Sequence, residues 1–526
     1  MWGVSGVVVE VCLVQGCFSC SCRCGVGVGL ARGGCCRLPG SREPPPRGSA
    51  PRGWWLSSVT GKDTNTAMNH QRYDHEPDRP GARRARSRWW AVGLAGMTGL
   101  ALTTSLGIGE APAIGAVDGT VTAADDRLGR SDRASTDNQD HQGKRKQNKH
   151  KGTPVPCSAD ALIAAITLAN ARGGAVLDLA KGCTYLLTAT IDGAGLPAIT
   201  TPITLNGGKH TSITRAAAAP LFRILTVEAG GHLTLNHLTI TGGQTETFDD
   251  GGGILANSGS TLAINHSVIR NNIGNNGGGV ANFGTTTVKH STVSENTARA
   301  NAGGLQNMAG LLTIERSKIT DNTAPGLAIG GGLGSINGAT TRINRSSITH
   351  NHSGLSGGGI GDFDATTVVT DSTISQNTAD VSGGGIFEEG QLTLRRVTIT
   401  DNNALDGGGG VEIQNVLGGS AATIEDSDIT NNTTGRGGGI RNLAATIVLR
   451  NTRIAGNQAD TGAGVFNNIG STLTLFSTKV VKNTAVTDGG GIFNEVGGTV
   501  ELNTATGTVV VKNRPNNCVN VTGCPD

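Results

Sequence analysis

Aromatic and aliphatic side chains are scarce in this chain of 526 residues. It contains nine Phe, five Trp and two Tyr, and all five Trp precede residue 91. Hydrophobic residues make up 36% of the sequence, which is low for an ordinary globular protein. Glycine is abundant, at 82 residues, but lacks the strict three-residue period of collagen. The composition therefore excludes a collagen helix and disfavours a conventional aromatic-rich core.

A surplus of basic residues is missing from most of the chain. The formal net charge is +3, yet residues 1–90 alone hold 13 Lys and Arg against 6 Asp and Glu. The remaining residues therefore hold 30 basic and 34 acidic side chains. Because nucleic-acid binding depends on excess positive charge, we expect no nucleic-acid partner for the main body.

Cysteine is rare in the main body and concentrated at the start. Seven of the eleven Cys lie at positions 12, 17, 20, 22, 24, 35 and 36. Thiolates this close are able to share a zinc ion, but the spacing matches no standard four-ligand pattern and includes no His. The Gly, Arg, Pro and Cys of residues 1–67 are more typical of a wrongly assigned start or a disordered segment, with Met68 as an alternative first residue.

Residues 68–116 have the features of an export signal. Four Arg between positions 83 and 88 precede an uncharged run from Ala91 to Ile108, and small residues at 111, 113 and 116 offer cleavage sites. The alternative is that this uncharged run is not cleaved and serves as a membrane anchor, because a run of this length is able to span a bilayer. Residues 117–154 are polar and predict a charged, disordered linker. We expect an extracellular or cell-surface protein, with the Sec or twin-arginine route left open.

One phrase recurs from residue 224 onward. It reads apolar-x-x-Ser/Thr-x-Ile/Val-x-x-Asn, and successive copies are 24 to 30 residues apart. Ten copies in register are the signature of a repeat architecture. The closing Asn of each copy is Asn272, Asn296, Asn322, Asn351, Asn377, Asn402, Asn432, Asn457, Asn483 and Asn513.

The repeat predicts an all-β fold. Apolar residues alternate with polar ones, β-branched residues dominate, and Gly triplets such as 357–359 punctuate the turns. A unit of this size cannot bury its own apolar face, so equivalent units stack. We predict a right-handed parallel β-helix of 10–12 coils over residues 155–526, with an N-terminal cap (155–223), repeats (224–513) and a C-terminal cap (514–526).

Each column of equivalent residues has a predicted role. Ile, Leu and Val fill the core, and the Asn column forms a structural ladder of amide hydrogen bonds. A Ser/Thr column is a second polar stack: Ser267, Ser291, Ser317, Ser346, Ser372, Ser427, Thr452 and Thr478. An amphipathic helix that begins near Cys157 predicts the N-terminal cap. Cys157, Cys183, Cys518 and Cys524 are disulfide candidates whose three possible pairings the sequence does not distinguish.

These features resemble a known family. Cys157-Ser158, Gly182-Cys183-Thr184-Tyr185, the repeated Gly-Gly-Gly-Ile/Val and the ending Asn517-Cys518 are similar to secreted bacterial right-handed parallel β-helix repeat proteins of the pectin-lyase-like superfamily. More distantly, Gly462-Ala463-Gly464-Val465-Phe466-Asn467 resembles the repeats of chlamydial polymorphic outer-membrane proteins, which act in adhesion. The resemblance implies either a binding role or cleavage of acidic polysaccharides.

One column offers candidate catalytic residues. Asp362 and Glu388 replace Asn on neighbouring coils, about 5 Å apart, with Asp364 and Glu389 beside them. Carboxylates at this separation are able to act as acid and nucleophile, or to share a calcium ion.

Two other columns are weaker candidates. Glu295, Asp321 and His350 form a second charged column, and His266 stacks with His290 one coil away. Arg316 and Arg345 continue the histidine column, so we predict no metal site there.

The absence of other cleft features favours a non-catalytic role. Intervals between Asn rungs never exceed 30 residues, so long loops that wall a cleft are missing, and the repeats lack Trp and Tyr. We predict a secreted or cell-surface, adhesin-like binding rod for a polysaccharide or cell-surface ligand, with no resident cofactor apart from the calcium alternative. The alternative function is a polysaccharide lyase or glycoside hydrolase. The sequence predicts no oligomeric state.

Overall fold

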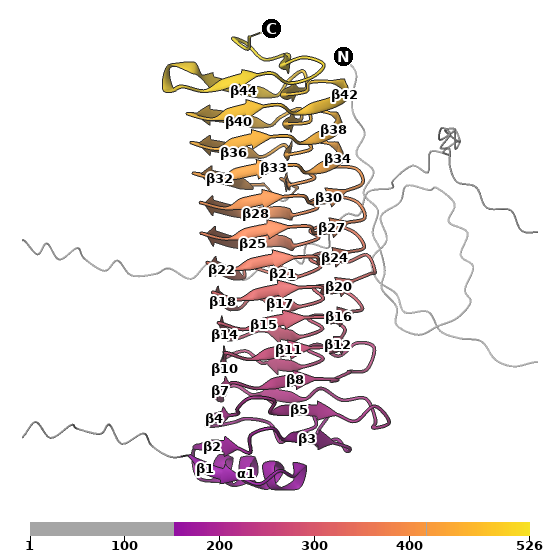
Figure 1. Ribbon diagram of the computed structural model, residues 1–526, viewed down its shortest axis with the longest axis vertical. Helices are drawn as coiled ribbons and strands as arrows, with labels where there is room; N and C mark the ends of the chain where they lie inside the picture. The colour runs from indigo at the N-terminus through magenta and orange to yellow at the C-terminus, as the bar shows by residue number, and fades with distance from the viewer. Residues whose placement is uncertain (1–151, 417, 526) are drawn as a thin grey trace, which may run out of the picture. The chain divides into compact units, whose positions relative to one another are not determined.

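The computed structural model describes residues 152–416 and 418–525, which form one column of stacked coils (Figure 1). The predicted wrongly assigned start (1–67), the export signal (68–116) and most of the linker (117–154) lie outside these residues. The predicted fold class is confirmed: the coils form a right-handed parallel β-helix of about 14 turns. Parallel stacking begins already at β1 (Thr153–Val155) and β2 (Ala175–Leu179), before the first Asn rung, which adds coils to the predicted 10–12.

Each coil passes through four short strands in a fixed order. A five-residue strand of a first face is followed by a three-residue strand of a second face and a two-residue strand of a third row. A Gly cluster then leads into a strand of a fourth row, which returns to the first face. We call the turn between the first and second faces the first corner, and the turn between the second face and the third row the second corner.

The strands of the first and second faces give the β-helix its two exposed flat sides. The first face contains β4 (Pro202–Asn206), β7 (His232–Asn236), β10 (Thr261–Asn265), β14 (Thr285–Lys289), β18 (Leu311–Glu315), β22 (Thr340–Asn344), β32 (Ala421–Glu425), β36 (Thr446–Arg450), β40 (Thr472–Phe476) and β44 (Thr499–Asn503). The second face is the 13-stranded sheet of β3 (Thr184–Leu187), β5 (Ser212–Arg215), β8 (Thr239–Thr241), β11 (Val268–Arg270), β15 (Thr292–Ser294), β19 (Lys318–Thr320), β23 (Ser347–Thr349), β26 (Thr373–Ser375), β29 (Thr398–Thr400), β33 (Asp428–Thr430), β37 (Arg453–Ala455), β41 (Lys479–Val481) and β45 (Val509–Val511).

The third and fourth rows close each coil. The third row is a nine-stranded sheet from β12 (Ile273–Gly274) to β42 (Thr484–Asp488). The fourth row contains β9 (Ile254–Ala256), β13 (Val280–Asn282), β17 (Leu305–Met308), β21 (Leu333–Ile336), β31 (Val411–Gln414), β35 (Ile440–Leu443), β39 (Val465–Asn467) and β43 (Ile492–Asn494). Two longer strands, β25 (Ile360–Thr370) and β28 (Ile386–Arg395), run through both the fourth row and the first face. They join these rows into one 24-stranded sheet.

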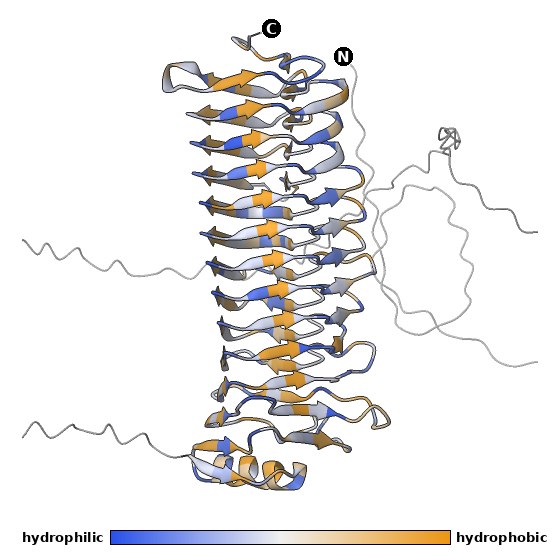
Figure 2. Ribbon diagram, viewed as in Figure 1, coloured by the Kyte–Doolittle hydropathy of each residue, from blue (hydrophilic) through white to orange (hydrophobic). Residues whose placement is uncertain are grey.

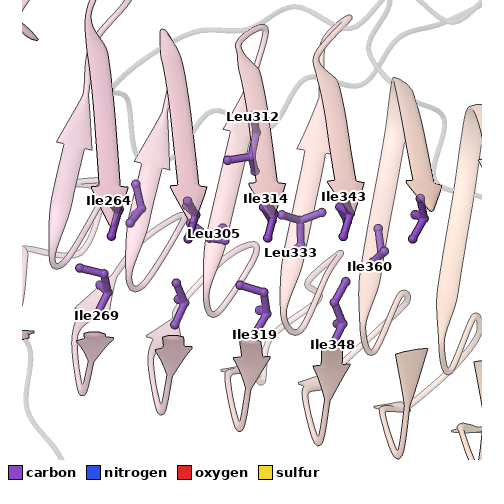
Figure 3. Packing of buried hydrophobic residues seen from close by; sticks show 14 of the residues in the cluster. Ile264, Ile269, Leu305, Leu312, Ile314, Ile319, Leu333, Ile343, Ile348 and Ile360 are labelled. Atoms are coloured by element: carbon purple, nitrogen blue, oxygen red, sulfur yellow. The ribbon is translucent and has the colours of Figure 1, made fainter. Parts of the chain in front are cut away.

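Stacked aliphatic side chains fill the interior. Ile264, Ile314 and Ile343 extend inward from the first face and meet Ile269, Ile319 and Ile348 of the second face, and all are at most 1% exposed (Figure 3). Inward and outward residues alternate along each strand, which gives the bands of hydrophobic and hydrophilic residues in Figure 2.

Buried Asn side chains form a continuous ladder at the second corner. From Asn272 to Asn513, each Nδ2 donates to the Oδ1 of the next coil's Asn at 2.9–3.0 Å. Asn377 illustrates the full set, because its Nδ2 also donates to the Ile348 carbonyl at 2.9 Å and its Oδ1 accepts from the backbone N–H of Asn351 at 3.0 Å. Each amide therefore links three coils. At the first corner the Ser/Thr hydroxyls have a similar role, since Ser291 Oγ accepts from the Ser267 backbone N–H at 3.0 Å.

Both ends carry a disulfide. The predicted N-terminal capping helix is α1 (Ala159–Ala171), with Ser158 as N-cap and Leu162, Ile166 and Ala169 buried against the first coils. Cys157 bonds to Cys183 with Cα atoms 5.7 Å apart, and Cys518 bonds to Cys524 with Cα atoms 6.2 Å apart. Within residues 152–416 and 418–525, no helix has the length and apolarity to cross a bilayer.

We expect Asn377→Ala to lower the free energy of unfolding by about 3 kcal/mol or more. The change removes the acceptor of two Asn351 donors and the donor to Ile348, and a buried polar group left unpaired costs about 1–3 kcal/mol. Chemical denaturation measures this loss. Gln376→Asn is the matched control, since Gln376 is exposed at φ 56°, a conformation that Asn tolerates, and an equal loss in both variants would contradict a special role for the ladder.

Candidate functional site

Asp362 and Glu388 lie inside the β-helix. They are partners across β25 and β28, and both are 0% exposed. Their column in the fourth row faces inward on every coil, and its other members are Asn282, Asn307, Ser335, Ile413, Asn442, Asn467 and Asn494. The sequence hypothesis therefore placed the correct two residues side by side, but an external polymer does not reach either carboxyl group in this structure.

The neighbouring rungs show what this column normally does. Asn282 Nδ2 donates to Asn307 Oδ1 at 2.8 Å and to the Leu311 carbonyl at 3.3 Å, so the amides satisfy both each other and the backbone of the corner. In β25 and β28 the strand continues through this corner, and backbone pairing extends from Ile360 to Thr370.

The two carboxyl groups lack compensation in this interior. None of their four oxygens has a hydrogen-bond partner among the described residues, and neither has the Thr367 hydroxyl beside them. Burial raises the pKa of the Asp362 carboxyl to about 6, and the nearby Thr367 and Ser335 side chains offset part of this rise. Burial, and then the neighbouring charge of Asp362, raise the pKa of the Glu388 carboxyl well above its ordinary value. The folded state therefore favours the protonated, neutral forms.

Asp364 and Glu389 lie around the corner from this pair. The register of β25 and β28 shifts between Phe363 and Ala365, so Asp364 is the extra residue of a bulge, at φ 51° and exposed, while Glu389 is 3% exposed. Both line a surface depression of about 170 Å³ together with Thr366 and Gln391. Ligand pockets commonly enclose about 300–1,000 Å³, so this depression is too small to enclose a sugar chain.

The second candidate column is exposed and stacks one residue per coil, as the sequence predicted. Glu295, Asp321 and His350 occupy left-handed positions at the second corner of successive coils, with φ between 55° and 57°. Among the residues that the structure describes, no group of three or more His, Cys, Asp or Glu side chains is arranged to hold a metal ion.

The histidine column is longer than the sequence hypothesis stated. His237 joins His266 and His290, and the ring centroids are 4.9 and 4.8 Å apart with interplanar angles of 12° and 4°. Metal–nitrogen bonds of about 2.1 Å bring two ligand nitrogens to at most about 4.2 Å from each other. Parallel rings at the coil spacing therefore do not chelate one metal ion.

Sequence reasoning missed a buried ion pair. Arg441 Nη1 lies 3.2 Å from Glu412 Oε2 and 3.2 Å from Asp406 Oδ2, and Glu412 is almost completely buried. Burial raises the pKa of the Glu412 carboxyl although the Arg441 charge opposes the rise. The alternation of Phe387, Glu412, Arg441 and Phe466 in one column was the available signal. These side chains pack between the fourth row and the Gly-rich turns, so they hold the coil closed.

The chain matches no protein-family model and no curated protein sequence. Among solved structures, it is similar to the A-modules of the Azotobacter vinelandii mannuronan C-5 epimerases AlgE6 and AlgE4. The match to AlgE6 has 16% identity and a TM-score of 0.38, covering 70% of this chain and 94% of the other. The match to AlgE4 has 14% identity and a TM-score of 0.38, covering 65% and 90%. A tailspike protein mutant of E. coli bacteriophage HK620, in complex with a pentasaccharide, matches with 11% identity and a TM-score of 0.29, covering 65% and 74%. These similarities concern the fold alone.

We expect the stability of the protein to fall as the pH rises from about 4 through 6. The folded-state pKa values of Asp362 and Glu388 exceed their unfolded values, so the folded state binds more protons in this window and the free energy of unfolding decreases with pH. The shift for Asp362 alone corresponds to about 3 kcal/mol. Denaturant titrations at pH 4, 6 and 8 measure the effect.

Asp362→Asn/Glu388→Gln is expected to remove most of this pH dependence, leaving the part that is due to the raised pKa of Glu412. It restores the amide side chains found on other rungs, so the variant gains about 3 kcal/mol or more at pH 8 and little at pH 4. Asp364→Asn is the control, because it removes a neighbouring exposed acid. Identical pH profiles for the wild type and the double variant would show that the pair does not control stability.

Proposed function

We propose that this protein is an exported, non-catalytic rod that binds a long polysaccharide along its outer surface. The observation that carries the proposal is the second face, whose outward side chains are almost uniformly hydroxyls. From β5 to β33, Ser or Thr occupies 14 of the 18 outward positions, the exceptions being Val268, Arg270, Lys318 and Asp428. Two of the 14, Ser294 and Ser375, are only 7% and 8% exposed, so the other twelve carry the accessible hydroxyls. The rows repeat at the coil spacing of about 4.8 Å.

Such rows suit a repeating polar ligand. A hydroxyl both donates and accepts hydrogen bonds, and some of these bond along the row, as Thr349 does to Thr320 and Thr430 to Thr400, both at 3.2 Å. A flat array without a dominant pocket contacts a long polymer at many weak points, and the sum gives affinity through multivalency. The burial of Asp362 and Glu388 supports the non-catalytic role, since a catalytic acid must lie within hydrogen-bond reach of its substrate.

The two disulfides support export. Cys157–Cys183 and Cys518–Cys524 fasten the two ends, and disulfides persist mainly in oxidising compartments outside the cytosol. An open β-helix end exposes strand edges, so a covalent cap protects a protein that acts outside the cell.

We expect the full-length protein to be retained on one or more neutral polysaccharides without cutting them. The assay incubates the protein, with calcium, with a panel of neutral and acidic polysaccharides and measures retention together with new reducing or unsaturated ends. New ends that vanish in Asp362→Ala/Glu388→Ala would establish the enzymatic alternative, and an absence of both retention and cleavage would contradict the proposed function.

Thr320→Val/Thr349→Val/Thr400→Val tests the second face directly. Valine keeps the shape and strand preference of threonine but removes the hydroxyl, so we expect binding to weaken about tenfold with the fold unchanged. The matched control is Thr287→Val/Thr313→Val/Thr393→Val, which removes three hydroxyls from the outward side of the first face. Equal weakening in both variants would contradict a site on the second face.

A further inference from the structure

The first corner of five consecutive coils carries a single His or Arg. Every one of these residues is exposed and adopts a left-handed conformation, with φ between 46° and 54°. The backbone N–H of each donates to the next coil, as His266 does to the Lys289 carbonyl at 3.0 Å, so they form one continuous column. The coil before them has a longer first corner, Gly207–Thr211, which carries His210. We call the column, together with His210 at its start, the basic ridge: His210, His237, His266, His290, Arg316 and Arg345.

The surroundings of the ridge reinforce its positive charge. The outward side chains of the flanking strands and the residue before His210 add five cations: Lys209, Arg270, Lys289, Lys318 and Arg342. In the described strands β4–β22 and β5–β23 of these six coils, Glu315 is the one acid, and it lies 2.9 Å from Arg316 and 3.6 Å from Lys289. The other acids of the same coils lie away from these two faces: Glu295 and Asp321 occupy the second corner, and Glu228, Glu246, Asp249 and Asp250 lie in the segments that lead back to the first face.

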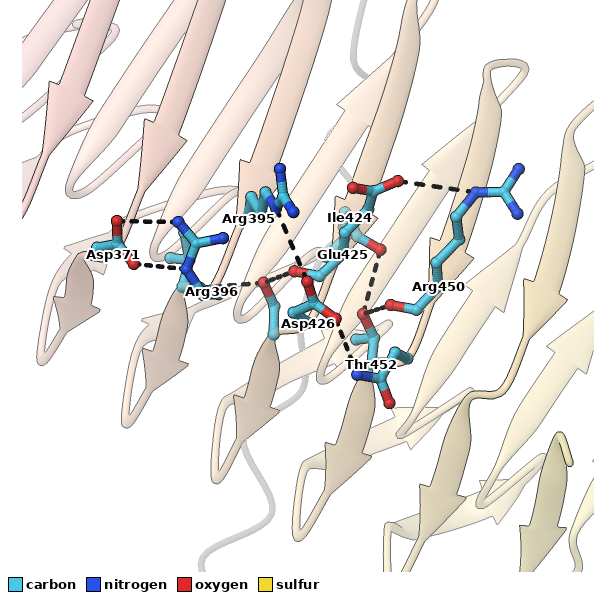
Figure 4. Close-up of polar contacts among 11 residues, drawn as sticks. Asp371, Arg395, Arg396, Ile424, Glu425, Asp426, Arg450 and Thr452 are labelled. Atoms are coloured by element: carbon cyan, nitrogen blue, oxygen red, sulfur yellow. Dashed lines mark hydrogen bonds and ion pairs between the residues drawn. The ribbon is translucent and has the colours of Figure 1, made fainter. Parts of the chain in front are cut away.

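The positive column ends where the corner residues become paired. The next residue is Asp371, which makes a bidentate ion pair with Arg396 of the following coil, at 2.6 and 3.0 Å (Figure 4). Asp426 then accepts from Asn451 at 2.8 Å and lies 3.8 Å from Arg395. Charge on the later coils is therefore neutralised within the column, whereas the ridge has a large excess of cations over about 25 Å.

The three stacked imidazoles make the charge of the ridge sensitive to pH. Histidine is the side chain whose charge ordinarily changes between pH 5 and 8. The charged groups around the stack are His210 and Arg316 along the column, Lys289 and Glu315 on the first face, and Arg270 on the second face, with His232 at the start of β7. The rings lie 4.8–4.9 Å apart, so an anion lying across the stack contacts more than one of them.

We propose that the basic ridge binds a linear polysaccharide that carries carboxylate or sulfate groups, and that binding tightens as the pH falls from 7.5 to 5.5. The inference rests on the proposed function, for which it names a ligand class and a second surface. Cations repeat once per coil, which complements anions that repeat along a polymer. The hydroxyl rows of the second face begin directly beside the ridge and contact the neutral parts of the same chain.

Matched polymers separate charge from sugar. The full-length protein is titrated with dextran sulfate, carboxymethyl-dextran and uncharged dextran at pH 5.5 and 7.5 and constant ionic strength, with a single-stranded DNA oligonucleotide as a further probe. We expect dextran sulfate or carboxymethyl-dextran to bind about tenfold more tightly at pH 5.5 than at pH 7.5, with affinity falling steeply with salt. The relative affinity of these two polymers distinguishes sulfate from carboxylate as the preferred group.

Three variants test the ridge itself. Asn is the replacement at each position because it tolerates the left-handed conformation and already occupies the corner at Asn451. His237→Asn/His266→Asn/His290→Asn is expected to reduce the pH effect to less than about twofold. Arg316→Asn/Arg345→Asn is expected to weaken binding at both pH values. Lys482→Asn/Lys512→Asn is the control, since it removes two exposed charges in the same conformation from the second corner of other coils, and binding should be unchanged.

Each remaining outcome overturns the inference in a defined way. Unchanged pH dependence in the triple His variant would exclude the imidazole stack, and equal weakening by the Lys variant would indicate non-specific attraction. If the protein binds DNA more tightly than either anionic dextran, and the ridge variants lose this binding, the ligand of the ridge is a nucleic acid and not an anionic polysaccharide. Retention on neutral polysaccharides without binding of anionic dextrans would leave the proposed function intact and remove the ridge as a site. If the protein neither is retained on neutral polysaccharides nor binds anionic dextrans, the proposed function is rejected as well.

Discussion

The hydrogen bonding of each coil to the next is the constraint on which the rest of this structure depends. Backbone pairing fixes the coil spacing at about 4.8 Å, and the buried Asn ladder locks that spacing at the second corner. Because each amide bonds to the coils on both sides, a coil that tilted or shifted would leave several buried polar groups unpaired. Every outward column therefore repeats at one spacing, which turns single residues into rows of hydroxyls and rows of cations.

The same constraint explains why the buried carboxyl pair is unusual. A parallel β-helix places identical positions on top of each other, so two acids at one inward position are forced into proximity without water. Asp362 and Glu388 have no hydrogen-bond partners, whereas Glu412 in a different column lies beside Arg441. The interior thus contains one compensated and one uncompensated acidic site, and protonation is the means by which the second avoids a buried charge.

The fold was predictable from sequence because its constraints are periodic. The Asn and Ser/Thr columns mark the two corners of each coil, so the order of the coils followed from their spacing, while strand type followed from alternation and the capping helix from its amphipathic pattern. The first coils lack Asn at the second corner, so the number of Asn rungs underestimated the number of coils. The inward direction of Asp362 was also encoded: it lies two residues after the buried Ile360, and alternate residues of a strand share a face. The bulge at Asp364 and the Glu412–Arg441 pair depend on contacts between different rows, which no single period reveals. The sequence therefore placed the carboxyl pair on neighbouring coils correctly without showing that the coil closes around it.

Charge is also distributed unevenly along the axis, and this asymmetry is informative. If charged corner residues served only to join coils, complementary pairs such as Asp371 and Arg396 would be expected throughout. Instead, five coils near the N-terminal end stack His and Arg on each other, with no acid in the column beside them. The left-handed corner itself does not require basic residues, since Asp426, Asn451 and Ser477 occupy it on later coils. The fold therefore tolerates neutral residues where the ridge has basic ones, and the geometry of the corner does not account for their presence. The proposed polyanionic ligand accounts for it, because its anions would lie opposite the basic side chains of the ridge.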